Sequence, residues 1–458
     1  MVFIRKIKKK SGIYLAKVES YRVDGKVKQK VIKYIGKDIG GKVVRNIRTD
    51  HIVVDRVKRY LDVVVVDKIA EELELKKILG EKSKFILTFV YSHLTERPSI
   101  KKMEEWLQNT EILDILKIKN ISTKNLYETL SFVDTEMNFE KIESQIFKKF
   151  DEIESNDKAV VIDITDTYLN GSKIKSKARR GKDGKYKKLI QTALAVTLKH
   201  GFPIFHKTYG GNIPNIKIFK DMMAELRSRG FKSIIVDRGA YSDENIKALI
   251  ELGIVGIVGV KKTEFFKKNF LSKISRNEIY SKKNRVNLKN TSVYIQSFDY
   301  FDGKVICVYN PQMEMLKREI HYEKGGNDDE VSKYLGYSLI FHNTKLDDSD
   351  VVSRYFDKDV VEKSFKKIKG VLSLRPIRVW LLEHIKGHIK ICYLSYTILS
   401  MLHYKLKKLG ISGPEAIEIL KTGYKVHMRD KKTDFSWDSV VTLKKDQEEI
   451  LKIVGCSV

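Results

Sequence analysis

Cysteine is scarce in this chain, and its distribution excludes two kinds of stabilising site. Cys307, Cys392 and Cys456 are isolated and odd in number. They include no Cys-x-x-Cys pair, so neither a disulfide framework nor a zinc knuckle is expected. No apolar run approaches about 18 residues, and the basic start around Arg5 and Lys6 leads into mixed residues. We therefore expect a reduced, cytoplasmic protein with no export signal and no membrane span.

Acidic residues are also in short supply relative to basic ones. The 458 residues contain 88 Lys and Arg against 59 Asp and Glu, a formal net charge of +29. With 42% hydrophobic residues and only six prolines, the chain has the apolar material to fold and is not a basic disordered tail. An excess of this size favours a polyanionic partner, nucleic acid first. A genome rich in A and T also produces proteins rich in Lys and Ile. The positive charge is therefore weaker evidence for a nucleic-acid partner than its size alone indicates.

The pattern along the chain predicts several domains. Residues 1–50 hold 15 Lys or Arg against 4 acids and alternate as strands do, whereas the following hundred residues have helical spacing, beginning with a helix over Val57 to Leu79. The expected divisions are 1–50, a basic β-unit; 51–150, a helical domain; 155–260, the first part of an α/β domain; 261–336, an inserted β-subdomain; 337–410, the second part of the α/β domain; and 411–458, a C-terminal helical or tail segment.

From residue 158 the periodicity changes to strands followed by alternating helices and strands. Three strand candidates in succession begin at Ala159, Leu189 and Pro203, and further strands follow at Ser233 and Ile254, each after a helical stretch. The order βββαβαβ resembles that of a ribonuclease H-like sheet. The fold class we expect is therefore α/β: a ribonuclease H-like mixed sheet with a β-rich insertion, preceded by the basic β-unit and the helical domain.

Two acids directly follow apolar strand candidates. Asp163 follows Ala159 to Ile162, and Asp237 follows Ser233 to Val236. An unpaired carboxylate at a core strand is costly unless a cation or a metal ion meets it, and ligands of such sheets gather where strands end. Both acids also have purely structural explanations. Asp163 could cap a turn at the end of its strand, and Asp237 could form a salt bridge with Arg238 or an Asx-turn.

A helix near residue 360 presents a third acid. Tyr355, Lys358, Glu362 and Lys369 are separated by 3, 4 and 7 residues, which keeps them on one narrow stripe. A solvated helix face with Glu–Lys pairs has the same pattern. Further along, Glu383, His384 and His388 also share helical spacing, and we expect them on a surface face near DNA.

Together the three acids have the composition of a phosphoryl-transfer site. Asp163, Asp237 and Glu362 would supply hard oxygen ligands to two Mg²⁺ or Mn²⁺ ions. The tract from Lys173 to Lys188 carries nine basic residues and one acid, which is typical of phosphate binding and equally of a solvated loop.

These motifs resemble the DDE transposases of prokaryotic insertion sequences, in the subgroup with a Tyr-x2-Arg-x3-Glu-x6-Lys signature. Here the signature reads Tyr355-x2-Lys358-x3-Glu362-x6-Lys369, with Lys in place of Arg at 358. Lys retains the positive charge at this position but lacks the planar guanidinium with which Arg binds a phosphate through two parallel hydrogen bonds. The resemblance implies that Asp163, Asp237 and Glu362 are catalytic metal ligands. DNA contacts are expected from Tyr355, Lys358, Lys369, Arg179, Arg180, Lys187 and Lys188.

The resemblance implies a nucleoid-associated transposase that binds terminal inverted repeats of double-stranded DNA. It would cleave the element's ends and join the 3′ hydroxyls to target DNA, as a homodimer that pairs two ends. Two rival functions fit the same basic surfaces: a catalytically silent DNA-binding regulator, and a structure-specific nuclease without strand transfer. A decayed element would be another silent DNA-binding protein, and the survival of all three acids disfavours such decay.

Overall fold

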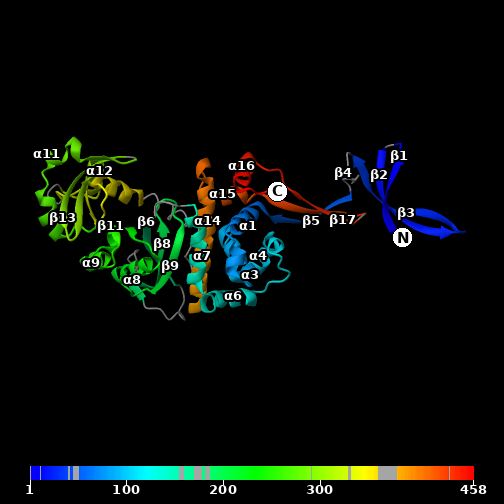
Figure 1. The fold of residues 1–458 in the computed structure, drawn as a ribbon, viewed down its shortest axis with the longest axis horizontal. Coiled ribbons are helices and arrows are strands. Elements are labelled where there is room, and N and C mark those ends of the chain that lie inside the picture. Colours follow the sequence, from blue (N-terminus) through cyan, green and yellow to red (C-terminus); the bar gives the residue numbers. More distant parts are fainter. Residues whose placement is uncertain are drawn as a thin grey trace. The chain divides into compact units, whose positions relative to one another are not determined.

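The structure is a computed structural model that describes residues 2–10, 12–39, 42–44, 51–153, 159–169, 178–180, 186–289, 291–327, 332–358, 379–432 and 434–457. The chain divides into two compact units (Figure 1). The first comprises Met1–Lys58 with Tyr424–Thr442, and the second comprises Arg59–Gly423 with Leu443–Val458. Each unit therefore combines segments that are distant in sequence.

The first unit consists of two antiparallel arrangements of strands. One sheet is ordered β1-β2-β3-β4 and the other β17-β16-β5. Their bounds are β1 (Val2–Lys9), β2 (Gly12–Val23), β3 (Lys26–Ile39), β4 (Lys42–Val44), β5 (Ile52–Arg59), β16 (Tyr424–Asp430) and β17 (Phe435–Val440).

The strand β5 corrects the helix expected from Val57. Residues 57–59 belong to β5, and helix α1 begins only at Leu61. The β-branched run that starts at Ile52 pairs with β16, and Arg429 of β16 binds Asp55 at 3.1 Å. The partner strand comes from the last part of the chain, so local periodicity could not reveal it.

In the second unit, a layer of helices follows β5. Its elements are α1 (Leu61–Glu72), α2 (Leu75–Leu79), α3 (Ser83–Thr95), α4 (Ile100–Gln108), α5 (Ile112–Ile115), α6 (Thr123–Thr135) and α7 (Phe139–Asp151). The long helix α14 (Leu382–Leu406) lies between β9 and the helices α1, α3 and α6, and α7 lies beside it against β9 (Figure 1). On the strand side, the Tyr396 hydroxyl donates to the carbonyl of Gly201 at 2.6 Å.

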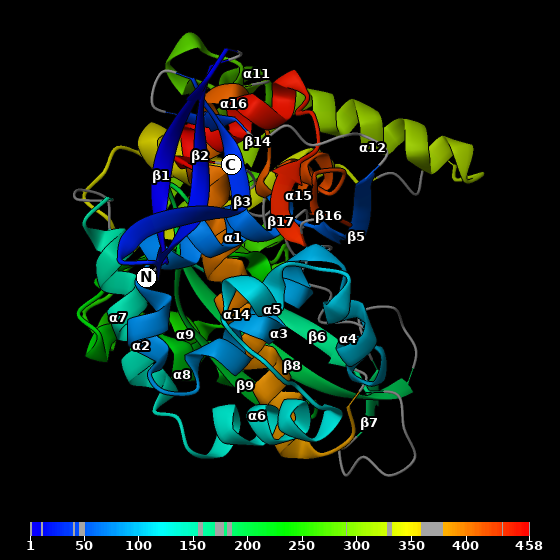
Figure 2. The same ribbon diagram turned by 90° about the vertical axis from the view of Figure 1, so that its right-hand side faces the viewer.

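Helix α14 also lies beside α3 and α6 (Figure 2), and this contradicts the surface position expected for its polar face. His384 is only 8% exposed and stacks on Tyr127, while Glu383 accepts a hydrogen bond from Ser131 at 2.8 Å. The expectation was wrong because helical spacing shows which residues share a face, not whether another helix covers that face. After α14 come η6 (Lys407–Leu409), α15 (Gly413–Leu420) and α16 (Lys445–Val454).

The centre of the second unit is a large mixed sheet, as the α/β prediction requires. Among the described residues, ten strands join in the order β12-β13-β14-β15-β11-β10-β6-β8-β7, with β9 on β8. The strands are β6 (Ala159–Tyr168), β7 (Ala178–Arg180), β8 (Tyr186–Thr197), β9 (Pro203–Gly210), β10 (Ser233–Val236), β11 (Val255–Val260), β12 (Arg285–Asn287), β13 (Ser292–Tyr300), β14 (Gly303–Tyr309) and β15 (Tyr337–His342).

The predicted order of these strands is confirmed. β6, β8 and β9 are antiparallel neighbours, and β6, β10 and β11 run parallel. The helices between them are α8 (Asn215–Ser228) and α9 (Asp243–Glu251), with the short η2 (Arg238–Ala240) directly after β10. A right-handed crossover helix is the usual connection between parallel neighbours, which explains the alternation of helix and strand in this segment.

The segment after β11 extends the same sheet. β15 pairs antiparallel with β11, and β14 pairs with β15 on its other side. Around these strands lie α10 (Glu264–Asn269), η3 (Leu271–Lys273), α11 (Arg276–Ile279), η4 (Lys282–Asn284) and α12 (Pro311–Glu323). A helical segment then covers residues 348–358, the last described residues before 379.

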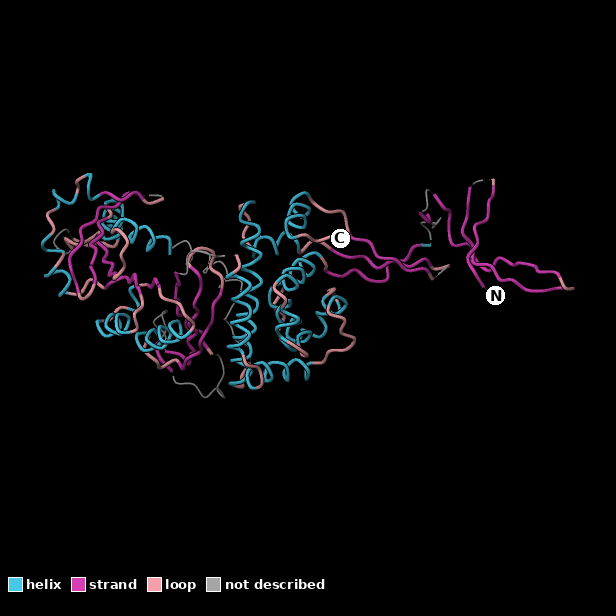
Figure 3. The backbone as a smooth tube through the Cα atoms, viewed as in Figure 1, coloured by secondary structure: helices cyan, strands magenta, loops and turns pink. Residues whose placement is uncertain are grey.

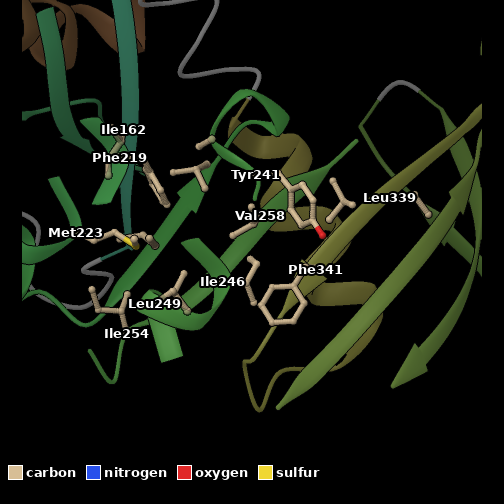
Figure 4. Close-up of a cluster of buried hydrophobic side chains, with 14 of the residues drawn as sticks. Ile162, Phe219, Met223, Tyr241, Ile246, Leu249, Ile254, Val258, Leu339 and Phe341 are labelled. Carbon is tan, nitrogen blue, oxygen red and sulfur yellow. The ribbon is translucent and has the colours of Figure 1, made fainter. Parts of the chain in front are cut away.

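A continuous hydrophobic core holds the sheet against α8 and α9. Phe219 and Met223 of α8 and Ile246 of α9 are buried together with Ile162 and Val258 of the strands (Figure 4). Burial of side chains of this size contributes about 1.5–3 kcal/mol each. This core fixes the relative positions of β6, β10 and β11, which carry the candidate site.

Candidate active site

Asp163 lies in the middle of β6, between β10 and β8. Its partner in β8 is Leu194, and the four residues before it are all buried. Asp163 itself is half-buried. Asp166 is an odd number of positions further and so belongs to the opposite face of the sheet, where it is only 1% exposed. Of these two acids, Asp163 is therefore the one at the more accessible face.

Asp237 directly follows the end of β10. Its side chain is 60% exposed, although the preceding Val236 is buried. The last registered pair between the parallel strands β6 and β10 is Val161 with Ile235. Asp163 and Asp237 each lie two positions beyond that pair, and neighbouring strands are about 4.8 Å apart. The two acids are therefore equally far past that pair, Asp163 still within β6 and Asp237 directly after β10.

Lys358 brings a positive charge to this edge of the sheet. Its Nζ lies 3.4 Å from Oδ1 of Asp237, and its side chain is only 3% exposed. Burial alone would raise the pKa of Asp237, but the Lys358 ammonium, the backbone N–H of Arg238 and the charge of Arg238 lower it below its ordinary value. Asp237 is therefore held as a carboxylate, the form that binds a cation.

Tyr355 lies one turn before Lys358, and the Lys358 Nζ is 4.9 Å from the centre of its ring. Val351, another turn earlier on the same stripe, is fully buried and anchors the helical segment. The Tyr355 hydroxyl approaches Gly259 of β11. A Cβ at Gly259 would collide with this hydroxyl and would lie 2.9 Å from the backbone nitrogen of Arg238. Glycine at this position therefore allows the phenol and the turn after β10 to come close.

More cations gather where β11 ends. Lys262 comes two residues after this strand and donates to the carbonyl of Tyr334 at 3.1 Å. Burial lowers the pKa of Lys262, and repulsion from Lys317, Lys267 and Arg238 lowers it further. β11 runs parallel to β10, so this positive region and Asp237 lie at the carboxyl ends of adjacent strands. Such a region attracts phosphate groups.

The basic tract predicted to bind DNA forms part of a hairpin. Arg179 and Arg180 lie in β7, where they pair with Lys187 and Tyr186 of β8, and Lys188 pairs with Ala178. The hairpin continues the β6–β8 ladder beyond Tyr168, at the carboxyl end of β6. Side-chain positions are described for Lys188, which is half-buried, but Arg179, Arg180 and Lys187 are described by their backbone alone.

Two of the predicted residues, Glu362 and Lys369, lie outside the described residues. Within the described ranges, no group of three or more His, Cys, Asp or Glu side chains has the geometry of a metal site. Asp163 and Asp237 nevertheless fit a hard divalent cation, because both carry carboxylate oxygens, each lies two residues past the last β6–β10 pair, and Asp237 is held ionised.

A cavity of about 400 Å³ lies elsewhere in the second unit, among α6, α7, β9 and α14. Glu143 and His206 face it and bind each other at 2.7 Å, and Arg229 also contacts Glu143. Neither Asp163 nor Asp237 lines this cavity. Lys390 likewise binds Asp134 at 2.9 Å. Most of the charged groups in the lining are thus paired, so the cavity is better explained as packing between layers than as a reaction site.

Gly259 and Lys262 belong to this region of the structure, although the sequence patterns had not pointed to either. A glycine within the apolar run of Ile254 to Val260 is a signal of close backbone approach, and it was available in the sequence. Lys262 had no such signal, because its significance depends on the neighbours that the fold assembles around it.

Comparison with known families identifies the class of protein. Residues 154–398 match the family described as "Transposase DDE domain", which is more than half of the chain. The chain therefore belongs to this family and is a DDE transposase. Residues 4–38 also match the N-terminal domain of IS1634 family transposases. The two matches together identify the transposase of an insertion sequence.

Two solved structures resemble the chain at low identity. One is piggyBac transposase in a synaptic complex with hairpin DNA, with 13% identity, a TM-score of 0.40, and coverage of 79% of this chain and 76% of that one. The other is the Drosophila P element transposase strand transfer complex, with 11% identity, a TM-score of 0.23, and coverage of 74% and 85%. No curated protein matches the chain significantly. None of the described helices is long and apolar enough to cross a membrane.

Proposed function

We propose that this transposase binds the terminal inverted repeats of its insertion sequence, cleaves the DNA at the element's ends and joins the freed 3′ hydroxyls to target DNA. The observation that carries the proposal is that Asp163 and Asp237 each lie two residues past the last registered pair of the adjacent parallel strands β6 and β10, in a chain of the DDE family. A ribonuclease H-like order of strands, β9-β8-β6-β10-β11, supports the same conclusion.

In this proposal, Asp163, Asp237 and Glu362 hold two Mg²⁺ or Mn²⁺ ions. Such ions, when bound, supply activation of the attacking water or 3′ hydroxyl and stabilisation of the leaving oxygen. Lys358 keeps Asp237 ionised and places a cation beside the scissile phosphate. The Tyr355 ring lies 4.9 Å from the Lys358 ammonium and supports it there. Lys369 would act with them as the last member of the signature Tyr-x2-Lys-x3-Glu-x6-Lys.

Duplex DNA would contact the basic segments on both sides of these acids. Arg179, Arg180, Lys187 and Lys188 are proposed to hold the backbone at the carboxyl end of β6. Lys262 and its neighbouring cations would do so at the end of β11. Such phosphate contacts position the DNA without reading its sequence. A homodimer is proposed because two element ends must be held together for joining.

Substitution of each acid tests the catalytic assignment. Asp163→Asn, Asp237→Asn and Glu362→Gln should each lower cleavage of an element-end duplex by at least about a thousandfold while duplex binding persists, since loss of a metal ligand removes stabilisation of the transition state. Asp243→Asn is the matched control, because Asp243 lies six residues after Asp237 and binds Tyr241 and Tyr300. Cleavage by an acid variant at the wild-type rate would remove that acid from the proposal.

A strand-transfer assay distinguishes the rival functions. With a labelled 3′-hydroxyl end and a supercoiled target plasmid, the transposase should yield joined products in Mg²⁺ or Mn²⁺. Cut ends that never join would identify a nuclease instead. Bound but uncut DNA would identify a DNA-binding regulator.

A further inference from the structure

The β2–β3 hairpin extends beyond the strand that covers its base. β1 pairs with β2 only as far as Glu19, whereas the β2–β3 ladder continues from Glu19 with Lys30 to Val23 with Lys26. Figure 3 shows the two strands running on together to their turn. Every residue from Tyr21 to Tyr34 is exposed. In the described part of the chain, residues 19–30 thus form a two-stranded ribbon with solvent on both faces.

The turn at the end of this ribbon is specified by the sequence. Asp24 and Gly25 connect the strands, with φ of 51° and 73°. Two central residues with positive φ define a type I′ turn, for which Asp-Gly is among the preferred pairs because its twist matches that of the strands. A two-stranded hairpin in water is only marginally stable by itself. The turn favours the hairpin conformation, and both faces of the ribbon are exposed. The ribbon is therefore suited to bind another molecule, which would stabilise it further.

One face of the ribbon is basic and partly apolar. Paired residues of an antiparallel ladder share a face, so Tyr21 with Lys28 and Val23 with Lys26 lie on the same side as Glu19 with Lys30. The opposite face contains Gln29, whose side chain Arg5 of β1 binds. The first face thus presents Lys26, Lys28 and Lys30 at intervals of about 6.8 Å, two strand residues each.

The dimensions of this face match a groove of duplex DNA. The major groove is about 12 Å wide and admits a two-stranded β-ribbon, whereas the minor groove is about half as wide. Lysines along one strand of the ribbon would meet the phosphates at the groove's edge, which recur every 3.4 Å of axial rise. Val23 and Tyr21, which are 37% and 44% exposed, would then face the base edges, where thymine methyl groups make apolar contacts.

We propose that residues 19–30 enter the major groove of duplex DNA and that Lys26, Lys28 and Lys30 bind its phosphates. This inference rests on the proposed function, in which the chain binds the ends of its insertion sequence. Another protein strand adding to the ribbon is the alternative. Lysines along an exposed strand oppose such addition, since they are a common means by which proteins keep strand edges from pairing.

Salt dependence of binding tests the phosphate contacts. Full-length wild type and the triple variant Lys26→Ala/Lys28→Ala/Lys30→Ala would be titrated with a 40-base-pair duplex from the element's end at several salt concentrations. The slope of log affinity against log salt should decrease in magnitude by about 3 in the variant. The matched control is Lys408→Ala/Lys445→Ala/Lys452→Ala, which removes three exposed lysines from η6 and α16. Its slope should change by less than about one unit.

A modified duplex tests the groove. Replacing cytosines with glucosylated 5-hydroxymethylcytosine fills the major groove with sugar and leaves the phosphates in place. Wild-type affinity should fall at least tenfold on this duplex, and the triple alanine variant should show little further loss. The variant Lys26→Arg/Lys28→Arg/Lys30→Arg retains the charges, so its affinity for the unmodified duplex should remain within about threefold of wild type.

The outcomes separate this inference from the function on which it rests. A wild type that fails to bind its element end contradicts the proposed function. A wild type that binds, with an unchanged slope in the triple alanine variant or unchanged affinity on the glucosylated duplex, overturns the ribbon proposal alone. A change of oligomeric state in the variant without loss of DNA affinity would instead assign the ribbon to contacts between proteins.

Discussion

The ammonium of Lys358 lies 3.4 Å from the carboxylate of Asp237, across a sequence separation of 121 residues. One partner is almost fully buried and the other is mostly exposed. A buried ammonium is costly unless a carboxylate or similar acceptor compensates it. The contact therefore joins the helical segment 348–358 to the end of β10 and places a positive charge beside the proposed metal ligand.

A double-mutant cycle should measure this coupling. Asp237→Asn removes the negative charge next to a buried ammonium and is expected to lower the free energy of unfolding by about 1–3 kcal/mol. Lys358→Met added to Asp237→Asn should restore part of that loss, giving a coupling energy of about 1–2 kcal/mol. Urea denaturation of the four proteins provides the values. Strict additivity of the two changes would show that the contact does not contribute to stability.

Gly259 and Gly239 form a matched pair for testing the approach of Tyr355. A Cβ at Gly259 would collide with the Tyr355 hydroxyl and crowd the Arg238 nitrogen, whereas a Cβ at Gly239 would have nothing within 4 Å. Gly259→Ala should lower the free energy of unfolding by about 1–3 kcal/mol. It should also slow DNA cleavage at least tenfold, because Tyr355 and the turn after β10 must separate. Gly239→Ala should leave the cleavage rate within about threefold of wild type, and equal effects of the two changes would contradict the argument.

Gly387 of α14 permits a close approach to α6. A Cβ there would meet the backbone of Leu130, and backbone atoms cannot move aside as the end of a side chain can. Gly387→Ala should therefore destabilise the second unit by about 2 kcal/mol or more, although alanine is the better helix former. Thermal unfolding followed by circular dichroism would show the effect. An increase in Tm would mean that α14 and α6 are further apart than described.

His388 should make stability depend on pH. Burial lowers its pKa to about 4, and its Nε2 lies 3.6 Å from the Cys392 sulfur. The unfolded chain, with a histidine pKa of about 6.5, binds more protons than the folded chain between these values, so stability falls as pH decreases through that window. His388→Asn should remove about 1–2 kcal/mol of the loss between pH 7.5 and 5. Urea denaturation at both pH values would measure it, and identical pH dependence in the two proteins would contradict the assignment.

Local patterns in the sequence were sufficient to predict the central strands and the acids that follow them. Ala159–Ile162 and Ser233–Val236 are short apolar runs, each ending at an aspartate, and both proved to be neighbouring strands of one sheet. These features can be predicted locally because a short apolar run is itself a strand signal and the aspartate is adjacent to it in the chain. Net charge and the signature spacing likewise required no coordinates. Glu362 and Lys369 stay predictions, since they lie outside the described residues.

Contacts between distant segments were decided by the tertiary structure alone. Pairing of β5 with β16 turned an expected helix start into a strand, and packing of α14 against α6 covered a polar face expected at the surface. The contact of Lys358 with Asp237 and the close approach of Tyr355 to Gly259 also join segments that are distant in the sequence. Each depends on packing between segments that are far apart in the sequence. Such packing produces no periodic pattern along the chain, so the sequence alone could not reveal it.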